Sequence, residues 1–219
     1  PSMISNLCQK HRISKFIHLS ALGIENAKDS RYATSKIRGE IEVRKNFKNV
    51  IILKPSIIYS VDDNFTTMLM SLLNLSPIFP LYYGGKTKFM PLHCSDICNL
   101  IFELIENDIE EKTIECIGPE VFTFKEMIEK LLKLIEKKRI FVPLPLIVAN
   151  IMAFFFQLLP KPLITKDQIK LLFYDNVPSG RYKTNFDIGK KFELSFEKEV
   201  EKYCYMWKQS GEYSRRNKN

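Results

Sequence analysis

The order of segments between Lys15 and Pro55 constrains the fold more than any other feature of the sequence. A short apolar run, Lys15–Ser20, is followed by a loop and then by a charged stretch with helical spacing, residues 31–46. A second apolar run, Val50–Leu53, ends just before Pro55. Two short apolar strands joined by a helix are typical of a βαβ unit. The sequence therefore predicts a parallel sheet with both faces covered.

The rest of the chain continues this alternation. Thr113–Ile117 reads as a third short strand, and Ser95 is expected to cap a helix that runs to Asn107. Thr123 and Glu126 have the spacing of a capping box, which predicts another helix. Further helices are expected around residues 64–75, 166–173 and 195–207. The predicted fold class is therefore α/β, with three parallel strands.

Tyr32 and Lys36 lie one helical turn apart, directly after the first predicted strand. Side chains at this spacing leave one face of a helix. A neighbouring ammonium group is expected to lower the pKa of the phenol, which would suit acid–base chemistry. The spacing alone is weak, because it recurs at Tyr82 and Lys86, where Gly84–Gly85 makes a helix unfavourable. Two exposed surface residues are the alternative interpretation.

The context of this pair resembles the extended short-chain dehydrogenase/reductase superfamily, from the second half of its Rossmann domain onward. Several further segments, in order, resemble the nucleotide-binding accessory subunit family of respiratory complex I (alpha-subcomplex subunit 9) and its bacterial relatives. These segments are Ile52–Ser56, Asp62–Phe65, Gly84–Pro91, Gly118–Phe124, Val142–Pro145, Leu163–Gln168 and Asp175–Val177. The resemblance covers about residues 4–207.

The resemblance implies a set of site residues. The end of the first strand, the helix and the turn after the second strand would line the nicotinamide end of an NADP(H) or NAD(H) pocket. The residues that it assigns to cofactor binding are Ser20, Tyr32, Lys36, Pro55, Ser56, Ile57 and Ile58. Ser20, Tyr32 and Lys36 are also the candidates for catalysis, although Leu22 stands where many enzymes of the superfamily carry the working hydroxyl.

The pocket is expected to be incomplete in this chain. The eight glycines include no GxxGxxG, the loop whose backbone N–H groups hold a dinucleotide diphosphate at a helix N-terminus. We therefore expect either a fragment of a longer protein or a partner chain that supplies the first half of the domain. Ser60 also stands where the family usually has glycine after Tyr59.

The expected architecture is a partial Rossmann domain with a smaller, mostly helical C-terminal lobe. Residues 1–120 would form the C-terminal portion of the Rossmann domain, with an inserted segment at about 64–92 that belongs to the second lobe. Residues 121–207 would form that lobe, and 208–219 a basic, disordered tail.

Net charge and cysteine content indicate which ligands and which cellular compartment to expect. The formal net charge of +8 favours acidic partners, but no nucleic-acid-binding motif accompanies it, so nucleic acid is not expected. Cys94 and Cys98, near His93, lack a further metal ligand at suitable spacing, and no metal site is predicted. The odd number of cysteines, five, indicates a reducing compartment.

An uncharged run, residues 146–159, is too short to cross a bilayer of about 30 Å. A core helix of the second lobe is the favoured interpretation. The alternative is a surface, including Phe154–Phe156, that contacts lipid or a membrane subunit.

The sequence thus predicts a non-catalytic accessory subunit of complex I that holds a structural NADP(H) and stabilises assembly. It would be peripheral to the mitochondrial inner membrane on the matrix side, or to the cytoplasmic face of a bacterial inner membrane. The alternatives are a catalytic NAD(P)-dependent epimerase, dehydratase or reductase of the same superfamily, and a membrane-surface binding module.

Overall fold

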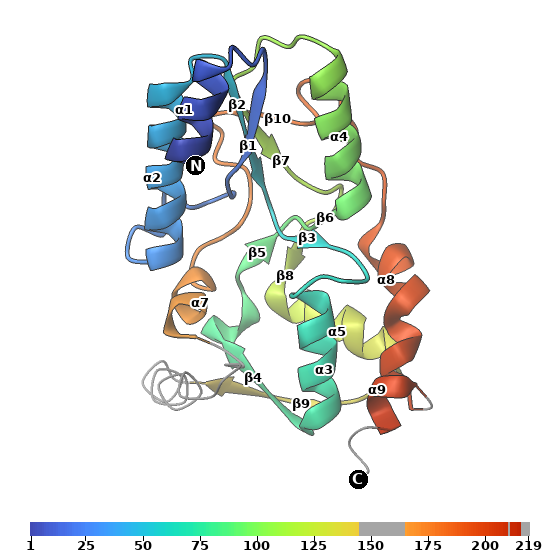
Figure 1. Cartoon of the computed structure of the whole chain (residues 1–219). Coiled ribbons are helices and arrows are strands. Elements are labelled where there is room, and N and C mark those ends of the chain that lie inside the picture. Colours follow the sequence, from blue (N-terminus) through green and yellow to red (C-terminus); the bar gives the residue numbers. More distant parts are fainter. Residues whose placement is uncertain (145–164, 210, 216–219) are drawn as a thin grey trace.

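The computed structural model describes residues 1–144, 165–209 and 211–215. Its elements form two layers of structure one above the other: a parallel sheet with its helices, and a lobe of helices and short strands beneath it (Figure 1). The predicted α/β class is confirmed.

The first lobe is built on a four-stranded sheet in the order β1-β2-β7-β10. The strands are β1 (Phe16–Leu19), β2 (Val50–Pro55), β7 (Thr113–Cys116) and β10 (Lys183–Thr184), and every neighbouring pair is parallel. The three predicted strands are confirmed. The fourth strand was missed because Lys183–Thr184 is short and polar and therefore carries no apolar signal.

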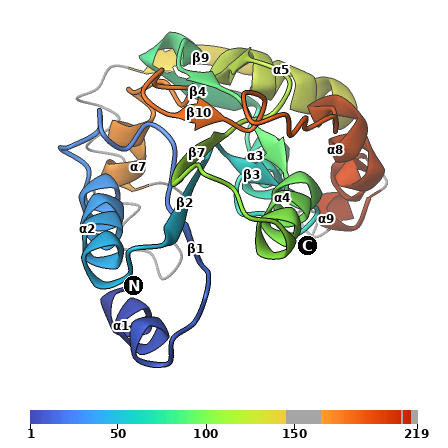
Figure 2. The ribbon, with the colours of Figure 1, turned by 90° about the horizontal axis from the view of Figure 1, so that it is seen from above.

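Helices cover both faces of this sheet, as the βαβ pattern predicts (Figure 2). α1 (Ser2–Lys10) and α2 (Arg31–Asn46) lie on one face, and α4 (Cys94–Glu106) lies on the other. Successive side chains of β2 point to opposite faces of the sheet, which explains how the helices pack on it. Val50 and Ile52 pack with Val43 of α2, whereas Ile51 and Leu53 pack with the apolar stripe of α4.

α4 begins two residues earlier than expected and has a different cap. The sequence predicts Ser95 as the N-cap, but the cap is His93, whose Nδ1 accepts a hydrogen bond from the Ser95 N–H at 3.2 Å. The expectation for Thr123 is confirmed: Thr123 and Glu126 form a capping box at the start of α5.

The second lobe has its own core. Its helices are α3 (Thr66–Leu75), α5 (Phe124–Leu134), α7 (Lys166–Leu171), α8 (Phe196–Cys204) and α9 (Glu212–Arg215), with short 3-10 turns η1 (Tyr83–Gly85) and η2 (Tyr205–Trp207). Its paired strands are β3 (Ile58–Tyr59) with β6 (Leu92–His93), β4 (Ile78–Tyr82) with β9 (Ile140–Leu144), and β5 (Lys88–Phe89) with β8 (Phe122–Thr123). Buried side chains of α3, α5 and α8 form one continuous cluster with Trp207.

The strand pairings bear on the proposed domain division, which stays a prediction. β4 and β5, from the predicted insertion at about 64–92, pair with β9 and β8 of the predicted second lobe. β10, in contrast, returns from residues 121–207 to the first sheet. The structure also differs from a disordered tail beginning at residue 208, since residues 212–215 are helical and the Tyr213 ring stacks on Trp207 at 4.9 Å between centroids.

Candidate functional site

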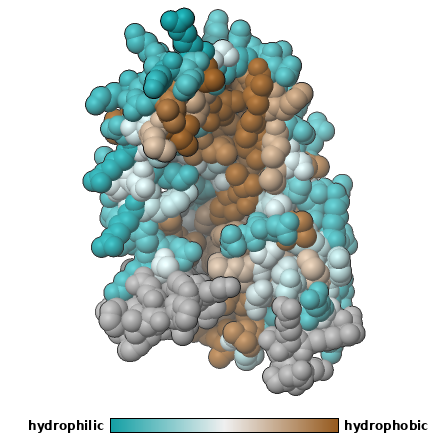
Figure 3. Space-filling model, in the orientation of Figure 1, coloured by the Kyte–Doolittle hydropathy of each residue, from teal (hydrophilic) through white to brown (hydrophobic). Residues whose placement is uncertain are grey.

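A cleft of about 970 Å³ lies at the carboxyl ends of β1 and β2, between the two lobes. All seven residues predicted to bind a cofactor line this cleft: Ser20, Tyr32, Lys36, Pro55, Ser56, Ile57 and Ile58. Figure 3 shows apolar side chains gathered along the middle of the same side of the molecule, with polar side chains at its margins. The structure thus brings the sequence candidates together, while their role as cofactor ligands stays a prediction.

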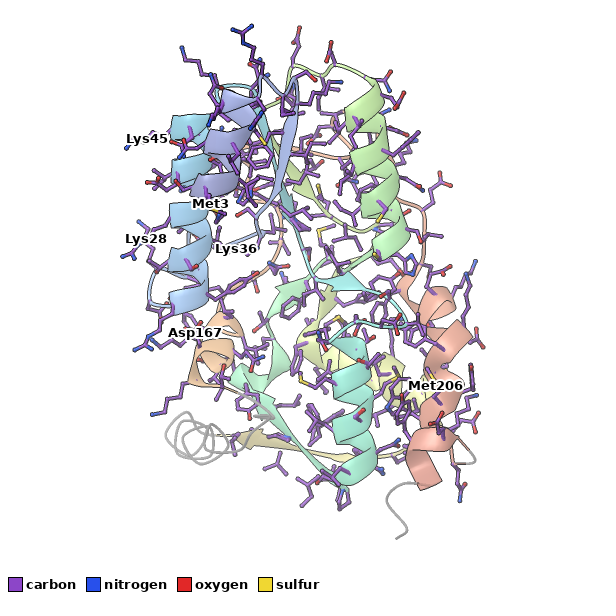
Figure 4. The ribbon with its side chains drawn as sticks, viewed as in Figure 1. Met3, Lys28, Lys36, Lys45, Asp167 and Met206 are labelled. Atoms are coloured by element: carbon purple, nitrogen blue, oxygen red, sulfur yellow. The ribbon has the colours of Figure 1, made fainter. Side chains whose placement is uncertain are left out.

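Tyr32 and Lys36 come from the first turns of α2, and both face the cleft. Figure 4 shows Lys36 on the inner side of this helix. The Lys36 ammonium lies 5.8 Å from the centre of the Tyr32 ring and donates to the Leu19 carbonyl oxygen at 3.3 Å. The pair therefore shares one environment at the end of β1.

The expected effect of Lys36 on Tyr32 was wrong. Burial raises the pKa of the Tyr32 phenol above its ordinary value. The cause is the cost of burying a phenolate, which acts although the Lys36 ammonium lies 5.8 Å from the ring centre. Tyr32 is thus held in its neutral form, as a hydrogen-bonding group.

The N-terminus of α2 is fixed by a residue from the other lobe. The Asp167 carboxylate, at the start of α7, accepts hydrogen bonds from the N–H groups of Arg31 at 2.8 Å and Tyr32 at 3.0 Å, and from the Ser30 hydroxyl at 2.9 Å. Figure 4 shows Asp167 directly below this end of the helix. A carboxylate here satisfies free backbone donors and is favoured by the helix dipole.

These contacts perturb Asp167 itself. Partial burial raises the pKa of its carboxyl, but hydrogen bonds from the Tyr32 and Arg31 N–H groups and from Ser30 outweigh that effect, so the pKa lies below its ordinary value. Asp167 therefore stays ionised and positions the first turn of α2, which carries Tyr32.

The turn after β2 is held by the Asp175–Val177 segment. The Ser56 hydroxyl donates to Asn176 Oδ1 at 2.5 Å, and Asn176 Nδ2 donates to the Leu22 carbonyl oxygen at 2.7 Å. One amide side chain therefore joins the turn after β2 to the loop after β1. The loop is tight at Gly23, where φ is +75° and an added Cβ would lie 3.0 Å from the Asp175 carbonyl oxygen.

Ser20 is not free to act in the cleft. Its hydroxyl donates to Glu40, a residue of α2, and Glu40 also accepts from Lys54 at 2.9 Å. Lys54 is 1% exposed and donates to Glu25 as well. Burial lowers the pKa of the Lys54 ammonium, but its hydrogen bonds to the two carboxylates outweigh burial and raise it. Ser20 thus belongs to an ionic group built around the buried ammonium of Lys54.

Sequence reasoning missed Glu25, Glu40 and Lys54, because ion pairs between residues so far apart in the chain leave no local pattern. Asp167 and Asn176 fell within segments quoted for the family resemblance, but no role was predicted for them. The i, i+4 spacing of Lys36 and Glu40 was the available signal that Glu40 lies on the same face of the helix.

No metal centre is found among the residues that the structure describes. Cys94 Sγ and Cys98 Sγ lie 4.0 Å apart at the start of α4, away from the cleft lining. His93 caps α4, and His18 is half-buried beneath α2, where burial and then Lys36 lower the pKa of its imidazole although Glu40 raises it.

No helix in the described ranges is long and apolar enough to span a membrane. The sequence prediction for residues 146–159, including Phe154–Phe156, lies outside the described residues.

Comparisons with known proteins agree with the sequence resemblance. No protein-family model matches the chain. It is 27% identical over 188 residues to the NADH-ubiquinone oxidoreductase 40 kDa subunit of Neurospora crassa, which covers 85% of this chain and 49% of that protein. It is 31% identical over 121 residues to the Dictyostelium discoideum NADH dehydrogenase 1 alpha subcomplex subunit 9, a match that covers 55% of this chain and 34% of that protein. It is 27% identical over 179 residues to the mouse protein of the same name, which covers 81% of this chain and 48% of the mouse protein. The chain thus spans at most about half the length of these relatives.

Solved structures show the same fold. A Streptomyces venezuelae dTDP-glucose 4,6-dehydratase has a TM-score of 0.63 at 15% identity, covering 99% of this chain and 64% of that one. A Bacillus cereus UDP-glucuronic acid 4-epimerase has a TM-score of 0.61 at 16% identity, covering 93% and 65%. The chain is thus similar in sequence to the complex I alpha-subcomplex subunit 9 proteins, and it shares its fold with part of the dehydratase and of the epimerase.

Proposed function

We propose that this chain serves as a non-catalytic accessory subunit of respiratory complex I, in which it holds a structural nicotinamide dinucleotide. The support from sequence is that the curated relatives are named as subunits of that complex. The support from geometry is that all seven predicted cofactor ligands line one cleft.

The observation that carries the non-catalytic part of the proposal is the engagement of Ser20. Its hydroxyl donates to the carboxylate of Glu40, which also pairs with the buried Lys54, and is therefore oriented away from a substrate. A hydroxyl that assists a reaction at a carbonyl must donate to the substrate instead. The raised pKa of Tyr32 points the same way, because a proton acceptor at neutral pH needs a lowered pKa.

The described residues fit the nicotinamide end of the cofactor. Within the part of the chain that the structure describes, the Lys36 ammonium donates one hydrogen bond, to the Leu19 carbonyl oxygen at 3.3 Å, which leaves donors for ribose hydroxyls. The Tyr32 hydroxyl offers a further polar contact, and the turn at Pro55–Ile58 offers an apolar wall for a flat ring. A nicotinamide cofactor supplies hydride transfer in enzymes; here we propose that its binding free energy stabilises the subunit.

We further propose NADP(H) as the nucleotide, with NAD(H) as the alternative, and other complex I subunits as the partners. The proposed location is peripheral, on the matrix side of the mitochondrial inner membrane or on the cytoplasmic face of a bacterial one. Contact with lipid or a membrane subunit through residues 146–159 is part of the same proposal.

Purification in gentle detergent tests this function. A tagged chain should comigrate with complex I activity on a native gel, and Tyr32→Phe should comigrate equally, because the proposal needs no proton transfer from the phenol. Migration of the chain apart from the complex would contradict the proposal.

A catalytic dehydratase, epimerase or reductase is the second candidate, favoured by the placement of Tyr32 and Lys36 together in the cleft. Under this alternative, Tyr32→Phe abolishes turnover of a nucleotide-sugar or carbonyl substrate, whereas the accessory role predicts that there is no turnover to lose.

A further inference from the structure

The half of the cleft beneath the nicotinamide end has walls of a different chemistry. It is lined by α3, β4, β9 and α7 of the second lobe. The residues that these elements contribute are Met68, Leu69, Leu72, Leu75, Ile78, Phe79, Pro80, Tyr82, Val142, Leu144, Gln168 and Leu171. None of these described residues is charged, and most are aliphatic.

The apolar lining forms a continuous strip along α3. Met68, Leu72 and Leu75 follow one another at helical spacing, which places their side chains along one face over roughly 10 Å. Leu75 is 64% exposed and Ile78 is 50% exposed, so the strip reaches solvent at its lower end. The cleft is therefore a passage with an apolar floor and an open end, not a closed core void.

Among the described residues, the lining of this half of the cleft suits a hydrocarbon chain better than a diphosphate. A sugar nucleotide carries a diphosphate, which needs cations or convergent N–H donors. In the described lining the charged side chains are Lys36 and Asp175, and both lie at the upper end. An unbranched hydrocarbon chain, in contrast, needs no polar partner and gains affinity from each methylene removed from water.

We infer that this half of the cleft binds a long fatty acyl chain. Its tail lies along Met68, Leu72 and Leu75, and its carboxyl or carbonyl end points to Lys36, the cationic side chain of the described lining. A volume of about 970 Å³ leaves room for such a chain beside a nicotinamide. The inference goes beyond the proposed role in complex I and does not depend on it.

Calorimetric titration of the full chain with fatty acids of increasing length tests the inference. Octanoate, laurate and palmitate should bind with rising affinity, approaching about fourfold for each added methylene until the strip is filled. UDP-glucose, as the polar comparison, should show no saturable binding. Affinity that does not change with chain length would overturn the inference.

Matched substitutions locate the binding. Met68→Glu places a carboxylate on the apolar strip and should weaken palmitate binding at least tenfold. Met3→Glu makes the same change at a side chain of α1 that is 73% exposed and outside the cleft lining, and should leave binding unchanged. Circular dichroism checks that both variants fold, and Met68→Gln, expected to weaken binding less, replaces Met68→Glu if that variant does not.

Equal palmitate affinity in the Met68 and Met3 variants would show that the fatty acid binds elsewhere and would refute the assignment. Such a result would leave comigration with complex I untouched, so a failure here is distinguishable from a failure of the proposed function.

Discussion

At the residue scale, the candidate site depends on side chains that hold its walls in place, namely Asp167, outside the cleft lining, and Asn176, within it. Asp167 fixes the start of α2, and Asn176 joins the two loops that form the upper wall. Both come from segments after residue 160, far from the strands that they position. The site is therefore formed by the returning C-terminal part of the chain as much as by the βαβ unit.

Asp167→Asn should destabilise the fold by about 1 kcal/mol, the usual size of a helix N-terminal interaction. Because folding lowers the pKa of Asp167, its contribution is present above the unfolded pKa and is lost as the pH falls through the folded one. Urea unfolding should therefore show the difference from wild type at pH 7, and the difference should shrink in acid below about pH 4. Asp62→Asn, at an exposed position, should change little; equal effects of the two variants would contradict the assigned role.

Lys54→Met should cost about 3–5 kcal/mol, because it leaves Glu25 and Glu40 without their buried cation. Adding Glu25→Gln and Glu40→Gln to this variant should recover part of the loss by removing the unpaired charges. Chemical denaturation of the single and triple variants measures both effects. A triple variant less stable than Lys54→Met would show that charge burial is not the cause.

At the element scale, local patterns predicted most helices and strands, but they did not predict one short strand or the residue that caps α4. The boundaries of α2 follow from Ser30 at its start and from the amphipathic run to Asn46. β10 escaped prediction because its two residues pair through backbone groups and carry no apolar pattern. Ser95 was a reasonable cap by residue type, but the imidazole of His93, two residues earlier, accepts its N–H.

The junction of β6 and β7 offers a sharp test of packing between elements. An added Cβ at Gly118 would lie 1.8 Å from the Pro91 carbonyl oxygen, so Gly118→Ala should prevent correct folding. Gly180→Ala is the comparison, because a Cβ there meets no atom within 4 Å and the positive φ of +72° costs about 1–2 kcal/mol. Soluble yield and melting temperature distinguish the variants. A Gly118→Ala protein as stable as Gly180→Ala would contradict this junction.

At the scale of the whole molecule, the cleft joins two lobes that pack around separate cores. A ligand that contacts both lobes stabilises the folded state by mass action, by about 2.7 kcal/mol at one hundred times its dissociation constant. Sequence patterns predicted which residues of the first lobe face this cleft. They did not predict that uncharged residues of the second lobe line the cleft. These residues come from four separate elements, α3, β4, β9 and α7, and the apolar pattern of each element is also typical of a core segment.

The most direct test of the proposed role is the nucleotide content of complex I that is purified through a tag on this chain. We predict that a nicotinamide dinucleotide copurifies with the wild-type complex. Lys36→Met should lower its occupancy several-fold, because this change removes the ammonium that faces the cleft. Equal nucleotide content in both preparations, or none in either, would contradict the account.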